Sequence, residues 1–198
     1  MSMSTQRTSS TNHSTNPPHG QGPSAELTLG QRLAGKYMAF KLAQEEYALE
    51  ILKVREIIGL MQITHVPRTE PHIRGVINLR GRIIPVLDLR LRFGMDSAEP
   101  TDQTVIIVVQ CRRGCEETTM GLLVDEVLEV LSIDAEDIAP QPTFGDGSVD
   151  TGFIMGIGKV DSRVVFLLDI DFIISGESSS LEFGGFDGQA LSAGFIGE

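Results

Sequence analysis

The stretch from Gly75 to Leu91 constrains the fold most, because it consists of two apolar segments that meet at a glycine. β-Branched and aliphatic residues dominate both segments, which is typical of β-strands. Glycine adopts a positive φ at little cost, so the chain can reverse at Arg80-Gly81. The pattern therefore predicts a β-hairpin with a two-residue turn. Alternation along the first strand places Asn78 and Arg80 on one face and leaves the opposite face apolar.

Similar short apolar segments, separated by turn residues, recur between Lys36 and Ile174. About nine or ten of them have the length and composition of strands, and only brief helical turns interrupt them. This spacing favours small closed barrels over a layered α/β sheet. The fold class predicted is mainly β, and a stretch of this length can form two five-stranded barrels. The pattern alone does not choose between two barrels and one sandwich.

Two local patterns predict departures from regular strands. Apolar residues recur at helical spacing from Glu50 to Ile57, which predicts one or two helical turns that end at Gly59. The charged stretch from Cys111 to Thr119 is expected to be a long loop. A structural zinc site needs four ligands, and the cysteine pair of this chain, Cys111 and Cys115, has no second pair. Both cysteines are therefore expected to be reduced thiols.

The two ends of the chain differ in composition from the middle. Residues 1–35 are rich in Ser, Thr, Asn, Gln, Pro and Gly, and residues 175–198 are rich in Gly, Ser and acidic residues. Such segments bury too little apolar surface to offset the entropy of ordering, so both are predicted to be disordered tails around a domain of residues 36–174. A frayed helix is possible near Leu27 to Leu33. Scattered apolar residues in the second tail could bind a partner.

Charge and motifs exclude several classes of function. A net charge of −11 argues against nucleic-acid binding and against direct contact with anionic membranes. No signal peptide or transmembrane segment is found in the sequence, which favours a cytoplasmic protein. The glycine-rich stretch from Gly156 to Lys159 lacks the spacing of a phosphate loop, and no nucleophile elbow or metal-ligand motif is found. We therefore expect no cofactor, no metal and no catalytic residues.

Three separated motifs resemble the CheW-type chemotaxis coupling proteins. They are Tyr47 to Ile57, Ile73 to Gly81 with Ile84 to Leu89, and Gly121 to Val127. The resemblance extends from about Lys36 to about Ile174. It implies two SH3-like barrels packed together with a groove between them. It also implies a non-catalytic adaptor that couples the cytoplasmic tips of chemoreceptors to the regulatory domain of a CheA-type histidine kinase, and that is recruited to membrane receptor arrays.

The resemblance also implies site residues. Those on the receptor side are Val54, Gly75, Asn78, Arg80, Val105, Ile106 and Val130, and those on the kinase side are Glu56 and Ile57. The residues themselves allow a structural alternative, in which Arg80 braces a turn carbonyl and Asn78 caps the neighbouring helical turn. Two other functions remain open: a scaffold of the same fold in a non-chemotactic receptor–kinase array, and a small-molecule-binding barrel with a deep closed pocket.

Overall fold

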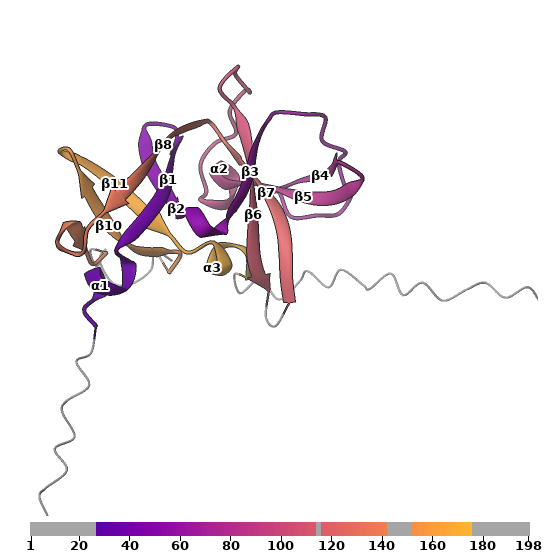
Figure 1. Ribbon diagram of the computed structural model, residues 1–198. Coiled ribbons are helices and arrows are strands. Elements are labelled where there is room, and N and C mark those ends of the chain that lie inside the picture. Colours follow the sequence, from indigo (N-terminus) through magenta and orange to yellow (C-terminus); the bar gives the residue numbers. More distant parts are fainter. Residues whose placement is uncertain (1–26, 114–115, 142–151, 176–198) are drawn as a thin grey trace, which may run out of the picture.

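The computed structural model describes residues 27–113, 116–141 and 152–175, and its strands form two sheets that lie side by side (Figure 1). The first sheet has the strand order β8-β1-β2-β11-β10-β9, and the second has the order β3-β6-β7-β5-β4. The strands of the first sheet are β1 (Gly35–Leu42), β2 (Glu45–Glu50), β8 (Glu126–Ile133), β9 (Ile138–Ala139), β10 (Ile154–Val160) and β11 (Arg163–Leu168). Those of the second are β3 (Val54–Gly59), β4 (Ile73–Leu79), β5 (Arg82–Asp88), β6 (Val105–Arg113) and β7 (Glu116–Val124). The helices are α1 (Leu29–Leu33), η1 (Ile51–Lys53), α2 (Leu89–Arg92), η2 (Ala135–Asp137) and α3 (Ile170–Ser175).

The order of the strands shows that the second sheet is inserted into the first. Strands β1 and β2 come before the insertion, and β8 to β11 come after it. Each sheet contains one parallel pair, β2 with β11 and β5 with β7, while its other pairs are antiparallel. The predicted fold class of two small β-barrels is confirmed, although the first sheet has six strands because the two-residue β9 joins it.

The hydrophobic core consists of three clusters that explain how the two barrels are joined. One cluster belongs to the first sheet and includes Tyr37 and Leu167, and another belongs to the second sheet and includes Ile77 and Ile106. The third, which we call the shared core, contains side chains of both sheets. Its buried members are Phe40, Leu42, Tyr47, Leu49, Ile73, Leu87, Leu89, Ile107, Val109, Cys111, Leu122, Val124, Leu168, Ile170 and Ile173. Burial of this continuous apolar surface holds the two barrels together.

The central hairpin has the predicted two-residue turn. Strands β4 and β5 pair so that Asn78 lies opposite Ile83, and the chain reverses at Arg80-Gly81. Both turn residues have positive φ, 54° for Arg80 and 84° for Gly81, as in the tight hairpin turns that match the twist of the strands. The side chain of Asn78 accepts a hydrogen bond from the amide of Gly81 at 2.8 Å. This bond stabilises the turn, so Asn78 caps the hairpin itself and not a neighbouring helical turn.

One local prediction was right only in part, and another was wrong. Of the one or two helical turns expected from Glu50 to Ile57, a single 3-10 turn forms, η1, and strand β3 follows it. The loop expected from Cys111 to Thr119 is instead an extension of the hairpin of β6 and β7, in which Arg112 lies opposite Glu117. Cys111 is buried in β6, and its thiol donates a hydrogen bond to the carbonyl of Thr118 at 3.4 Å. Burial, with the nearby Asp171, raises the pKa of this thiol to about 11, so it stays protonated at neutral pH. Cys115 lies outside the described residues.

The folded part begins before the predicted boundary at Lys36. Thr28 and Gln31 form a capping box at the start of α1, which places the frayed helix of the prediction in a defined position. Leu33 is buried in the core of the first barrel, and the hydroxyl of Tyr37 donates a hydrogen bond to its carbonyl at 2.6 Å. Helix α1 therefore covers one end of the first barrel. The rest of the predicted tails, residues 1–26 and 176–198, lies outside the described residues.

Candidate functional site

An open groove of about 940 Å³ lies on the second barrel. Its lining residues come from β3, from the turn and both strands of the central hairpin, and from β6 and β7. They are Arg55, Glu56, Leu79, Arg80, Arg82, Ile83, Ile84, Pro85, Val108, Gln110, Glu117, Thr118 and Thr119. This groove is therefore a feature of one barrel, whereas the resemblance implied a groove between the two.

An ion pair between Arg80 and Glu56 forms part of the groove wall. The guanidinium donates from Nη2 to Oε2 of Glu56 at 2.9 Å and from Nη1 to Oε1 at 3.4 Å. The side chain of Arg80 is 78% exposed and that of Glu56 is 31% exposed. Strands β3 and β4 are the two edge strands of the second sheet, and Glu56 lies on β3 while Arg80 follows β4. The pair therefore bridges the two ends of the sheet, and most of the guanidinium remains accessible to a partner.

Exposed apolar side chains lie in the groove, on the other face of β3 and just after β3. Ile83, on the hairpin strand β5, is 65% exposed and lines the groove. Ile57 is 41% exposed, and alternation along β3 directs it to the face opposite Glu56. Leu60 and Met61 follow β3 and are also exposed. Exposed aliphatic side chains beside a forked guanidinium are typical of surfaces that bind proteins.

The remaining receptor-side candidates lie in three different places. Val54 and Val105 are half-buried and pack against the shared core. Val130 is 49% exposed, but it lies on β8 of the first sheet, opposite Met38. Ile106 is 0% exposed and Gly75 is buried, so neither presents a side chain to a partner in this conformation. The structure therefore assigns Ile106 and Gly75 to the interior of the second barrel and corrects their expected place on a groove surface.

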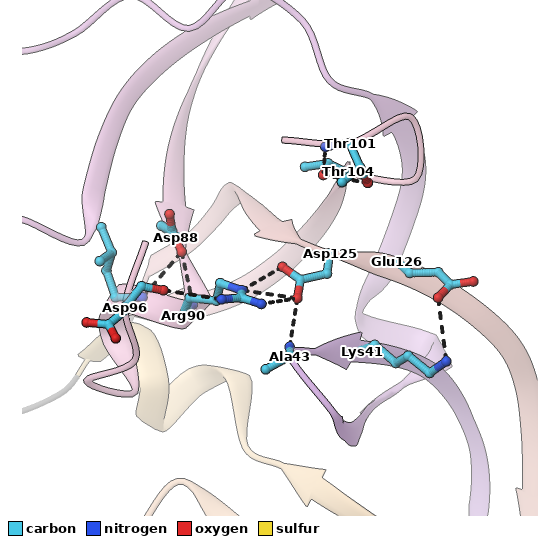
Figure 2. Close-up of polar contacts among 10 residues, drawn as sticks. Lys41, Ala43, Asp88, Arg90, Asp96, Thr101, Thr104, Asp125 and Glu126 are labelled. Atoms are coloured by element: carbon cyan, nitrogen blue, oxygen red, sulfur yellow. Dashed lines mark hydrogen bonds and ion pairs between the residues drawn. The ribbon is translucent and has the colours of Figure 1, made fainter. Parts of the chain in front are cut away.

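A polar clamp joins the two barrels where the chain passes from β7 to β8 (Figure 2). Asp125 lies at this crossing and accepts hydrogen bonds from Nε and Nη2 of Arg90 on α2, the shortest at 2.7 Å. It also accepts a bond from the amide of Ala43, between β1 and β2, at 2.7 Å. Asp88 caps α2 by accepting from the amide of Arg90 at 2.9 Å. One carboxylate thus connects elements of both sheets.

The clamp changes the acidity of Asp125. Burial alone would raise the pKa of this carboxyl, but the hydrogen bonds from Arg90 and from the amide of Ala43 favour the charged form and outweigh it. The pKa therefore lies below its ordinary value near 3.8. A depressed pKa means that the folded state releases this proton more readily than the unfolded state does. The resulting stability is complete above the unfolded pKa and is lost as pH falls through the folded pKa.

We predict that Asp125→Asn lowers the free energy of unfolding by about 1–2 kcal/mol at pH 7, because a charged hydrogen-bond acceptor is replaced by a neutral one. Urea denaturation measures the loss. The difference from the wild type is expected to be constant above about pH 5 and to shrink below about pH 4. Asp134→Asn, at an exposed position without a side-chain cap bond, is the matched control and is expected to change little. A pH-independent difference would show that the clamp acts through packing and not through charge.

Neither ion pair could be predicted from local sequence patterns. Arg80 and Glu56 are 24 residues apart, and Arg90 and Asp125 are 35 residues apart. The one signal that could have indicated the clamp is the position of its residues in the sequence. They lie within or just after the family-like motifs: Asp88, Arg90 and Asp125. In the described part of the chain, no three His, Cys, Asp or Glu side chains are placed to hold a metal ion. None of the described helices has the length and apolar character needed to cross a membrane.

Comparisons with known proteins agree with the motifs and the fold. The family model described as the CheW-like domain matches residues 36–178. The chain is 37% identical to the chemotaxis protein CheW of Klebsiella aerogenes over 152 residues, which cover 77% of this chain and 89% of that protein. It is 33% identical to the chemotaxis protein CheW of Bacillus subtilis, with 78% and 94% of the two chains covered.

A solved structure is similar as well. The crystal structure of the scaffolding protein TtCheW from Thermoanaerobacter tengcongensis has a TM-score of 0.63 and 38% sequence identity. The match covers 71% of this chain and 92% of that one. The match to the family model, the identity to curated relatives and the shared fold lead to one conclusion: the chain belongs to the CheW-like family of chemotaxis proteins.

Proposed function

We propose that this protein is a non-catalytic adaptor that couples the cytoplasmic tips of chemoreceptors to a CheA-type histidine kinase. Its membership of the CheW-like family supports a role in chemotaxis signalling. The observation that carries the finer proposal is the ion pair of Arg80 and Glu56. It joins a residue expected on the receptor side to a residue expected on the kinase side.

The chemistry of the groove suits an α-helical receptor tip. An exposed guanidinium can form a forked, charge-assisted contact with a carboxylate or with carbonyl groups of a partner. Ile83 and the half-buried Leu79 supply apolar surface beside it for an amphipathic helix. Ile57, on the other face of β3, is available to a second protein at the same time. Two partners can therefore approach opposite faces of one strand.

The ion pair offers a physical route between these two faces. A receptor that draws the guanidinium of Arg80 toward itself weakens the bonds to Glu56 and frees that carboxylate. Glu56 is next to Ile57 on β3, so a change at Glu56 alters the strand that the kinase would contact. A coupling of this kind is reciprocal, because each partner must change the affinity of the other by the same factor. The protein would act in the cytoplasm and reach membrane receptor arrays through its receptor partner.

Reconstitution tests the adaptor proposal directly. Receptor cytoplasmic fragments displayed on vesicles, the kinase and ATP are combined with and without this protein, and the rate of kinase autophosphorylation is measured. We expect the rate to rise only when all three proteins are present, and this protein to sediment with the vesicles. A rate that does not respond to the protein, together with no sedimentation, would contradict the proposal.

A further inference from the structure

The groove of the second barrel contains arginine side chains that form no ion pair with any described residue. Arg55 and Arg82 line the groove and are exposed, and neither forms an ion pair with any described residue. Of the two acidic residues of the groove, Glu56 pairs with Arg80, and Glu117 accepts a hydrogen bond from the neutral side chain of Gln110. The three arginines that line the groove therefore exceed its two carboxylates by one positive charge. Within a chain of net charge −11, this surface is a local site for an acidic ligand.

A second, smaller hollow of about 390 Å³ continues from this groove. It shares Arg55, Gln110 and Glu117 with the groove, and Arg112 adds a further positive charge, while Lys53 forms an ion pair with Asp171. Helix α3, which Figure 1 shows between the two sheets, lies at its edge. Asp171 of α3 accepts hydrogen bonds from Nζ of Lys53 at 2.6 Å and from the amide of Arg112 at 2.8 Å. The first turn of α3 is thus attached to the rim of the hollow.

The sequence that follows Ser175 contains the acidic and apolar residues that such a surface would bind. Ser175 is the last residue of α3, and its hydroxyl donates a hydrogen bond to the carbonyl of Asp171 at 2.7 Å, so the described part of the chain ends within one helical turn of the hollow. Residues 176–198 contain four acidic side chains and no basic ones. Leu181-Glu182-Phe183 and Phe186-Asp187 place apolar and acidic groups next to each other. At about 3.3 Å per extended residue, Leu181 can lie about 20 Å from Ser175 and Asp187 about 40 Å from it.

We propose that residues 181–187 bind in the groove of the same chain. Phe183 packs on the exposed Ile83, while Glu182 and Asp187 interact with Arg55 and Arg82. An intramolecular segment benefits from a high effective concentration, so weak contacts of this kind are enough to populate the bound state. The bound segment covers the site beside Arg80. If the proposed function is correct, it competes there with the partner of the groove.

The absence of tryptophan from the sequence makes a specific test possible. Phe183→Trp in the full-length protein introduces a single tryptophan, and acrylamide quenching of its fluorescence measures its accessibility without receptor or kinase. The comparison is with the same protein carrying the additional change Arg82→Glu. If the bound state is occupied at least half of the time, the quenching constant of the Phe183→Trp protein is expected to be at most about half of that of the doubly changed protein. Ile83→Ser is expected to raise the constant in the same way, because it removes the apolar contact.

Lys159→Glu is the control for charge, since Lys159 is exposed on β10 of the first barrel. It is expected to leave the quenching constant unchanged. Equal quenching with and without Arg82→Glu and Ile83→Ser would overturn the proposal. A low constant that rises on dilution of the protein would also overturn it, because the segment would then bind a second copy. Neither outcome depends on whether the protein is an adaptor, so this proposal and the proposed function can fail separately.

Discussion

Gly75→Ala is expected to lower the free energy of unfolding by about 4 kcal/mol. The alanine methyl group would clash with backbone atoms, and alanine would also have to adopt a strained backbone conformation. A Cβ at this position would lie 2.1 Å from the carbonyl oxygen of Thr64. Gly75 also has a φ of 136°, a conformation that is close to exclusive to glycine. Backbone strain and overpacking each cost about 1–3 kcal/mol, and neither is relieved by the movement of a flexible side chain.

The clash would also release a segment that protects the edge of the second sheet. Thr64 exchanges two backbone hydrogen bonds with Val76, at 2.8 and 2.9 Å, and so covers the outer edge of β4. Pushing Thr64 away would expose unpaired backbone groups of an edge strand. Gly75 is therefore a residue on which the barrel depends, and any effect of its substitution on receptor binding is expected to follow from the loss of this edge.

Urea denaturation of Gly75→Ala and of Gly59→Ala checks this expectation. Gly59 ends β3, has no atom within 4 Å of an added Cβ and does not have a positive φ. Its substitution is expected to change the free energy of unfolding by less than about 0.5 kcal/mol, as at other unconstrained surface positions. Equal stability of the two variants would contradict the account of Gly75.

The central hairpin could be predicted because its signals are local. Gly81 marks the turn, and the alternation of apolar and polar residues fixes the register that brings Asn78 opposite Ile83. The prediction of helical turns from Glu50 to Ile57 was right only in part, because the 3-10 turn η1 and the strand β3 together produce apolar residues at helical spacing. Ile51, Val54 and Ile58 recur at helical spacing, yet the chain forms a 3-10 turn and then a strand with a bulge between Val54 and Glu56. A bulge shifts the alternation of a strand and so resembles a change of period.

The end of the hairpin of β6 and β7 was wrongly predicted because its residues are charged. It was predicted to be a loop because Arg112 and Glu117 are charged, but these residues lie opposite each other across the two strands. Opposite charges in that position stabilise a strand pair. The site was less predictable than the fold. The family resemblance implied that Arg80 and Glu56 belong to different surfaces, and only the closure of the second barrel brings them into one ion pair.

Arg80→Ala is expected to separate stability from function. The side chain is mostly exposed, and a surface ion pair contributes about 0–1 kcal/mol, so unfolding should change by less than about 1 kcal/mol. Removal of a charged contact that becomes desolvated in a complex costs about 2–5 kcal/mol in binding, or roughly 30-fold to several thousand-fold in affinity. Lysine cannot form the same forked contact, so Arg80→Lys is expected to lose nearly as much binding as Arg80→Ala.

Arg68→Ala is the matched control for this substitution. Arg68 is an exposed arginine with a φ of 64°, close to the 54° of Arg80, and it does not line the groove. The two alanine variants therefore lose the same group from the same type of backbone. Arg68→Ala is expected to bind receptor and kinase as the unmodified protein does.

Receptor-dependent kinase activation by these variants, measured beside their urea denaturation, tests the adaptor account most directly. The account predicts that Arg80→Ala and Arg80→Lys remain folded and fail to activate the kinase at concentrations where Arg68→Ala activates it fully. If Arg80→Ala unfolds readily while its folded fraction activates the kinase normally, Arg80 only braces the second barrel. The claim that the groove beside Arg80 and Glu56 couples receptor to kinase would then be wrong.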